Sequence, residues 1–113
     1  AFTGHPLLTI PAPVDPRDRH ARHLYTLLLD VDHAGMTRNE LVTRLKAENI
    51  GTGIHFTALH LHTYYAQTYC YRRGQFPVTE FIGERTFSLP LSAKLTDEDV
   101  EDVIAAVRRV LGP

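Results

Sequence analysis

The last eighteen residues, "TDEDVEDVIAAVRRVLGP", constrain the fold more than any other stretch because they specify a helix at both ends. Thr96 is a preferred helix N-cap, and the three acidic residues that follow it are favoured by the positive end of the helix dipole. Two arginines occupy the last turn, and Gly112-Pro113 ends the helix. Apolar side chains recur at helical spacing at Val100, Val103, Ile104, Val107 and Leu111. The stretch therefore predicts an amphipathic helix that covers a core.

A second helix is predicted within "MTRNELVTRLKAENIG", residues 36–51. Thr37 and Glu40 have the spacing of a capping box, in which each side chain accepts from the other residue's backbone amide. The apolar stripe consists of Leu41, Val42 and Leu45. We expect Asn49 or Gly51 to end this helix.

Three stretches have the pattern of strands. Residues 23–32, "HLYTLLLDVD", alternate with apolar side chains on both faces, which is typical of an interior strand. Residues 52–57 predict a second strand, with Ile54 and Phe56 opposing His55.

The third strand is predicted at residues 86–91, "TFSLPL", with Phe87, Leu89 and Leu91 facing inward and Pro90 marking its edge or end. Between the second and third strands, residues 58–76 fit either a short helix or an irregular excursion. Pro77 is expected to open a helix of one or two turns through Glu84.

Residues 1–20 contain four prolines, a density that forbids a regular helix and prevents a central strand. We interpret them as an extended, linker-like lead-in and residues 21–113 as one domain. The order of elements predicts an α+β fold, a three-stranded sheet with helices packed on one face.

Composition narrows the classes of partner. The formal net charge of the 113 residues is −1, and no basic stripe is present, which disfavours nucleic acid and an anionic membrane surface. Cys70 is the only cysteine, so no internal disulfide is possible, and a cytoplasmic location is expected. The apolar runs, such as Leu27–Leu29, are far shorter than a membrane span, and the first residues do not resemble a signal peptide. The missing initiator Met indicates a processed product or a fragment.

Histidines cluster in "IGTGIHFTALHLHTYY", residues 50–65. A zinc site needs three or four converging ligands, but in an extended chain His55 points away from the side shared by His60 and His62. Half-buried packing at the end of a sheet is the commoner role for any one of them. For His55 a functional role weighs equally, because Gly51 and Gly53 permit close backbone approach and an imidazole at a strand end can contact an anion or transfer a proton.

The strings "RHLYTLLLD", "ENIGTGIHFTALHLHTYY" and "ERTFSLPLSAKLTDEDVEDVIAAV" together resemble the C-terminal small domain of the DegT/StrS family, from about Leu8 to Leu111. These are pyridoxal-phosphate-dependent aminotransferases that act on keto sugars attached to nucleotides. The chain is most similar to the type that aminates a UDP-linked 4-keto pentose on the way to aminoarabinose-modified lipid A.

The resemblance implies a homodimer of fold-type-I subunits, in which a large domain carries the cofactor and this small domain closes over the active site. It places His55, together with the adjacent Phe56, near the cofactor and the substrate. His60 matches a second recurring family position. The implied reaction transfers an amino group from a donor such as glutamate to a keto sugar nucleotide.

Two departures limit this resemblance. The lysine that binds the cofactor covalently and moves the proton is missing, because Lys46 lies in the first predicted helix and Lys94 in a turn. No catalytic residue is therefore assigned in this chain, which we expect to be inactive alone. Close relatives carry an arginine where this chain has Thr57, which weakens the expectation of anion binding at that position.

Two other functions remain open from the sequence. The chain is also compatible with a free-standing α+β binding or regulatory module derived from such an enzyme, and a metal site built from His55, His60 and His62 ranks last. The roles of His62 and Cys70 are not assigned.

Overall fold

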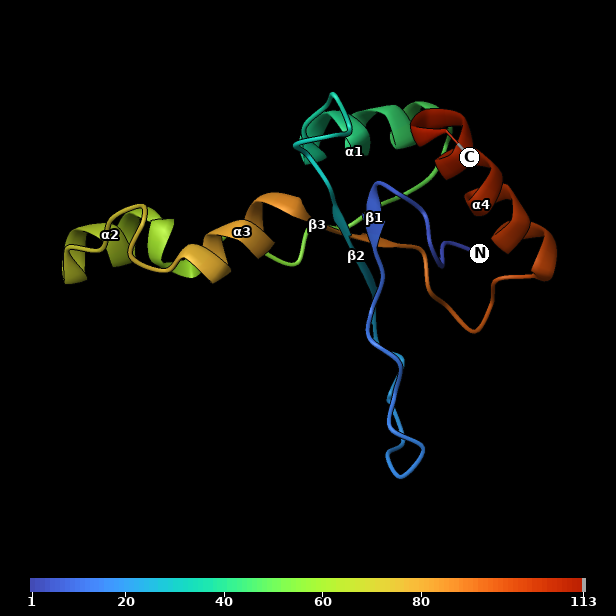
Figure 1. The fold of residues 1–113 in the computed structure, drawn as a ribbon, viewed down its shortest axis with the longest axis horizontal. Helices are drawn as coiled ribbons and strands as arrows, with labels where there is room; N and C mark the ends of the chain where they lie inside the picture. Colours follow the sequence, from blue (N-terminus) through green and yellow to red (C-terminus); the bar gives the residue numbers. More distant parts are fainter. Residues whose placement is uncertain (113) are drawn as a thin grey trace.

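An antiparallel sheet of three strands lies at the centre of the computed structural model, which describes residues 1–112 (Figure 1). Strand β2 (Tyr25–Leu29) pairs with β1 (Leu8–Thr9) on one side and with β3 (Thr86–Leu89) on the other. The predicted interior strand is therefore confirmed as the central one. The α+β class is also confirmed.

The predicted strand at residues 52–57 is wrong. Only Gly53 joins the sheet, through a single bridge in which its amide lies 3.1 Å from the Ser88 carbonyl and its carbonyl 2.8 Å from the Ser88 amide. Beyond Gly53 the chain leaves the sheet, and the alternating apolar side chains Ile54 and Phe56 face solvent instead of a core. The alternation of apolar residues at 52–57 therefore belongs to an exposed segment and not to a strand.

The N-terminal segment supplies the third strand in its place. β1 is an edge strand, the position in which neighbouring prolines are tolerated because one side of the strand needs no hydrogen-bonded partner. Phe2 and Leu8 are buried in the core, and the Asp30 amide donates to the Leu7 carbonyl at 2.9 Å. The lead-in thus contributes to the packing of the domain that it precedes.

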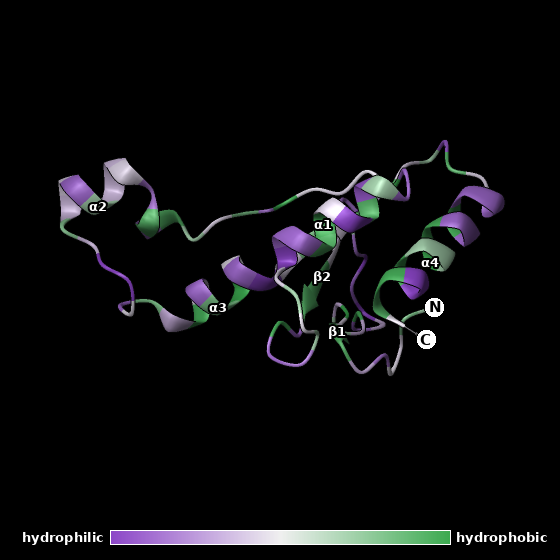
Figure 2. Cartoon of the chain, turned by 90° about the horizontal axis from the view of Figure 1, so that it is seen from above, coloured by the Kyte–Doolittle hydropathy of each residue, from purple (hydrophilic) through white to green (hydrophobic). Residues whose placement is uncertain are grey.

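Two long helices, α1 (Arg38–Ala47) and α4 (Asp97–Leu111), cover the sheet (Figure 1). Both begin with a complete capping box, Thr37 with Glu40 and Thr96 with Asp99. Their apolar sides face the sheet, and Figure 2 shows hydrophilic residues on the other side of α4. The buried core comprises Phe2, Leu8, Leu27, Leu29, Leu41, Leu45, Phe87, Leu89, Ala106 and Val107.

Residues 59–85 form a second region, which we call the arm. It contains the 3-10 helix η1 (Leu59–Leu61), α2 (Thr63–Tyr69) and α3 (Pro77–Arg85), and it projects away from the sheet (Figure 1). The helix predicted to open at Pro77 is confirmed. The arm helps to raise the radius of gyration to 15.8 Å, against about 13 Å for a compact domain of this length.

A buried arginine joins the arm to the rest of the fold. Arg38, at the start of α1, donates to the carbonyls of Thr86 at 2.6 Å and Gly83 at 3.3 Å. These acceptors lie where α3 ends and β3 begins, so the guanidinium satisfies carbonyls that the end of the helix leaves unpaired. Burial lowers the pKa of Arg38.

The end of β3 differs from expectation. The strand ends at Leu89, before Pro90, and Leu91 is exposed. All four residues of β3 are buried, the polar Thr86 and Ser88 as well as Phe87 and Leu89. Ser88 is covered because it pairs with Gly53 in the isolated bridge.

Candidate functional site

His55 lies just beyond the bridge to β3, with its ring folded back over Gly53. A Cβ atom placed on Gly53 would lie 2.5 Å from His55 Nε2 and 2.9 Å from Ser88 Oγ, closer than such contacts occur. Gly53 therefore permits the close approach predicted from the sequence. Gly51 has open space at the same position and no such role.

The imidazole of His55 is half-buried and accessible. Among residues 1–112, no side-chain hydrogen bond involves it, and its nearest aromatic neighbour is Phe56, edge to face at 5.1 Å. The Phe56 side chain is 74% exposed. His55 and Phe56 thus present an imidazole and a phenyl ring on an open surface.

His60 occupies a different environment, in the interior of the arm. Its side chain is only 6% exposed, and its Nε2 lies 2.8 Å from Glu80 Oε1. The same Glu80 carboxylate accepts from the amides of Gly74 at 2.8 Å and Phe76 at 3.4 Å. His60 is therefore one member of a polar network that ties η1 to α3.

The charge state of Glu80 follows from these bonds. Burial raises its pKa, but the hydrogen bonds from His60 and from the Gly74 and Phe76 amides together outweigh burial and leave the pKa below its ordinary value. Glu80 is accordingly a carboxylate at neutral pH and acts only as an acceptor. It follows that His60 donates from Nε2.

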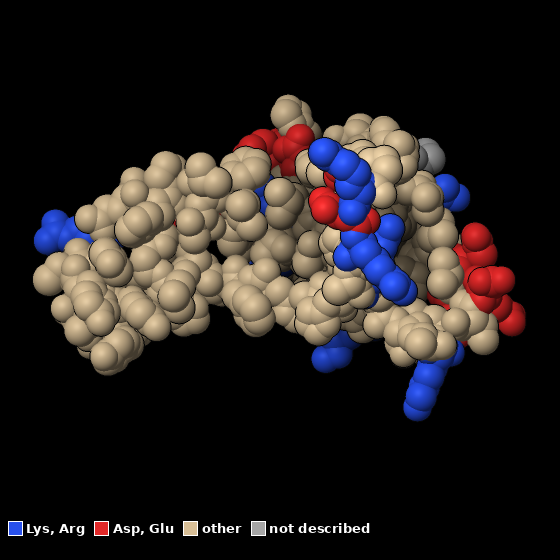
Figure 3. All heavy atoms as spheres, turned by 90° about the horizontal axis from the view of Figure 1, so that it is seen from below, with Lys and Arg blue, Asp and Glu red and all other residues tan. Residues whose placement is uncertain are grey.

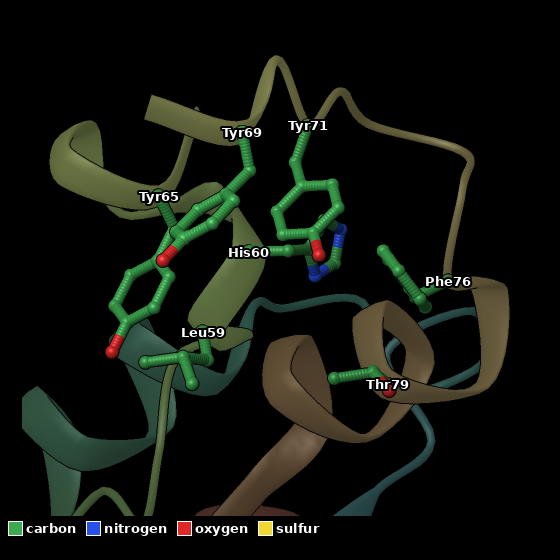
Figure 4. A pocket seen from close by; sticks show the side chains of 7 residues that line it. All are labelled: Leu59, His60, Tyr65, Tyr69, Tyr71, Phe76 and Thr79. Atoms are coloured by element: carbon green, nitrogen blue, oxygen red, sulfur yellow. The ribbon is translucent and has the colours of Figure 1, made fainter. Parts of the chain in front are cut away.

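One side of His60 faces a pocket of about 330 Å³ in the arm (Figure 4). Four aromatic side chains line it together with Leu59, His60 and Thr79: Tyr65, Tyr69, Tyr71 and Phe76. Tyr69 stacks on Tyr65 with ring centroids 6.1 Å apart and on Tyr71 at 5.7 Å. The stretch that the sequence left as helix or excursion thus forms an aromatic-walled pocket.

The structure does not bring the three histidines together. His60 is buried beside Glu80, His62 is the exposed N-cap residue of α2, and His55 lies near the sheet. No group of three or more His, Cys, Asp or Glu side chains able to hold a metal ion occurs among residues 1–112. Cys70 is exposed in the left-handed C-cap position of α2.

Glu80 is the residue that sequence reasoning missed. The one feature of the sequence that points to Glu80 is its position in "PVTE", in the first turn of the helix predicted to begin at Pro77. Its partners are 20 residues away in His60 and in a loop whose path the sequence does not specify. Arg85, the last residue of α3, forms an ion pair with Asp32 at 2.9 Å.

The resemblance implies pyridoxal phosphate, which needs an enclosed lysine amine to bind covalently. Lys46 is exposed on α1 and Lys94 is exposed in the turn before α4, and neither lies in the aromatic pocket. Neither amine is enclosed as a covalent cofactor site would require. The described part of the chain therefore does not by itself form a site for pyridoxal phosphate.

Comparison with known proteins identifies the family to which this fold belongs. The family model of the DegT/DnrJ/EryC1/StrS aminotransferases matches residues 2–108. The chain belongs to this family. It is 46% identical over 112 residues to the spore coat polysaccharide biosynthesis protein SpsC of Bacillus subtilis, covering 98% of this chain and 28% of SpsC.

Solved structures give the same result. The aminotransferase TlmJ from Streptoalloteichus hindustanus matches 97% of this chain with 28% identity and a TM-score of 0.80. DesV from S. venezuelae matches 99% of it with 27% identity and a TM-score of 0.83. The chain spans about 28% of each of these proteins. The fold matches the C-terminal part of these aminotransferases.

No helix within residues 1–112 combines the length and the apolar character needed to cross a membrane.

Proposed function

We propose that this chain is the C-terminal small domain of a pyridoxal-phosphate-dependent aminotransferase that transfers an amino group from an amino acid, glutamate, to a keto sugar nucleotide. The observation that carries the proposal is the match to SpsC, which covers 98% of this chain but only 28% of that protein. Together with the family match, this coverage supports the assignment of the chain to the small domain of a sugar aminotransferase, and a large domain would make up the rest.

The division of labour follows from the side chains. The large domain would supply the lysine and hold the cofactor, since neither lysine of this chain is placed to do so. This chain supplies His55 and Phe56 on an open surface, where a second domain would enclose them against the substrate. An imidazole in that position is suited to hydrogen-bond an anionic group or to transfer a proton. We assign His60 to the same side of the active site, where it acts through the Glu80 network.

The finer features of the proposal come from the family resemblance. The substrate would be a UDP-linked 4-keto pentose, and the active enzyme would be a cytoplasmic homodimer. Residues 1–20 would be the segment that connects the two domains, and residues 21–113 the small domain itself.

The decisive experiment compares two polypeptides. The protein translated from the reading frame that continues upstream of Ala1 is assayed for amino transfer from glutamate to a keto sugar nucleotide with added pyridoxal phosphate, beside the 113-residue chain. We expect activity from the longer protein and none from the chain alone. Substantial transfer by the 113 residues, or a start codon directly before Ala1, would refute the proposal and favour a free-standing binding module.

The role of His55 is tested by a pair of glycine variants in the longer protein. In Gly53→Ala the added methyl group would overlap His55 Nε2, so the ring must move, whereas Gly51→Ala meets open space. We expect at least about tenfold lower kcat/KM for Gly53→Ala, comparable with His55→Ala, and an unchanged value for Gly51→Ala. Equal activity of the two glycine variants would remove His55 from the active site.

A further inference from the structure

The function proposed above assigns no ligand to the aromatic-walled pocket of the arm. It is built by η1, α2, the loop at residues 70–76 and α3 (Figure 4). Its volume of about 330 Å³ lies within the range of small-molecule sites. It is concave and mainly apolar, with few polar groups, which is the usual composition of such sites.

The wall of the pocket is a row of rings. Tyr65, Tyr69 and Tyr71 follow one another at 6.1 Å and 5.7 Å with planes inclined by 22° and 24°, and Phe76 meets Tyr71 edge to face at 5.4 Å. These are distances of direct ring contact. A ligand therefore lies against the row and not between its members, and a flat ring makes the largest contact with it.

The polar side of the pocket consists of His60 and Thr79. Because His60 donates to Glu80 from Nε2, Nδ1 is the ring nitrogen left for a ligand, and no hydrogen bond from residues 1–112 occupies it. The Thr79 hydroxyl both donates and accepts. A buried, oriented imidazole nitrogen beside a hydroxyl fits the edge of a pyrimidine base, where an imide N–H lies between two carbonyls.

The loop that closes the pocket carries two arginines. Arg72 and Arg73 lie between Tyr71 and Phe76, and both are exposed. Arg73 is ion-paired with Glu84, while no side-chain bond of Arg72 occurs within the described residues. Guanidinium groups on a loop next to the pocket are suited to phosphate oxygens.

We propose that this pocket binds the pyrimidine base of a nucleotide, stacked on the tyrosine row and hydrogen-bonded to His60 and Thr79, with its phosphates at Arg72 and Arg73. The natural ligand follows from the proposed function, in which a sugar nucleotide is the amino acceptor. The pocket would then hold the nucleotide half of that substrate.

The test titrates the 113-residue chain with UDP and with inorganic pyrophosphate in a calorimeter. We expect saturable binding of UDP and much weaker binding of pyrophosphate. Tyr69→Leu removes the central ring of the row and should weaken UDP binding at least about tenfold, the loss expected for one stacking partner. Tyr64→Leu is the matched control, because Tyr64 is an exposed tyrosine of the same helix that does not line the pocket.

The outcomes separate the pocket from the aminotransferase function. No saturable UDP binding, equal binding of pyrophosphate, or equal effects of the two tyrosine variants would overturn the pocket proposal while amino transfer by the longer protein still stood. Tyrosine-dependent UDP binding with no amino transfer would leave the pocket and remove the enzyme. Should Tyr69→Leu unfold, Thr79→Val provides the second variant, and it should weaken uridine and UDP binding equally.

Discussion

Two regions of the molecule are stabilised in different ways. One is the sheet together with α1 and α4, and the other is the arm. In the first region a continuous core of apolar side chains lies between the helices and the sheet, and both helices have capping boxes. In the arm, α2 contains no buried residue, and neither α2 nor α3 has a side-chain cap. The arm is instead organised around Glu80, and Figure 3 shows a face of it that is largely free of charge.

The two regions also differ in how many apolar side chains they leave exposed to solvent. Apolar residues of the arm remain exposed at Leu59, Tyr64, Tyr69, Phe76, Val78, Phe81 and Ile82. Exposed apolar side chains gathered in one region are typical of a surface that contacts a partner or a ligand. The sheet region thus contains the buried apolar core, and the arm carries most of the large apolar side chains that stay exposed.

The largest effect is expected from a pair of phenylalanine substitutions. Phe87 in β3 is fully buried, while Phe81 in α3 is 49% exposed. Phe87→Ala should lower the free energy of unfolding by about 3–5 kcal/mol, and Phe81→Ala by roughly 1 kcal/mol or less because much less apolar area is removed from burial. Urea unfolding curves measure both. Similar losses would mean that the arm belongs to the same core.

Removing the charge of Glu80 should open the arm alone. Glu80→Gln keeps the size of the side chain but removes the charge and one of the two oxygens that accept from His60 and from the amides of Gly74 and Phe76. Hydrogen exchange at those two amides should become about tenfold faster or more, while amides of β2 keep their protection. An equal acceleration in β2 would show that the two regions unfold as one unit.

Acid should have the same local effect in the wild-type chain. The folded-state pKa of Glu80 lies below its ordinary value of 4.5, so its contribution is complete above that value and is lost as the pH falls through the lowered pKa. The protection of the Gly74 amide, the slowing of its exchange relative to an unfolded amide at the same pH, should therefore fall in this acidic range. In Glu80→Gln this loss of protection should be absent, which separates Glu80 from the carboxylates Glu40 and Asp99 of the capping boxes, whose pKa values are lowered as well.

The same contrast explains how much the sequence could predict. Capping boxes and buried stripes are local, so α1, α4 and the central strand follow from neighbouring residues. The edge position of Leu8–Thr9 could not be predicted, because it depends on pairing with a strand far along the chain. The contact of His60 with Glu80 is equally non-local, and the exposed face of Ile54 and Phe56 matches a half-buried strand by pattern alone.

The smallest effect compares the N-caps of the two regions. Thr96 accepts a hydrogen bond from the Asp99 amide at the start of α4, whereas His62 at the start of α2 makes no capping bond. Thr96→Ala should lower the free energy of unfolding by about 1 kcal/mol. His62→Ala should leave it unchanged, because the exposed imidazole satisfies no helix amide. Thermal unfolding of both variants distinguishes them, and a loss at His62 equal to that at Thr96 would show that α2 is held by its N-terminus and not through Glu80.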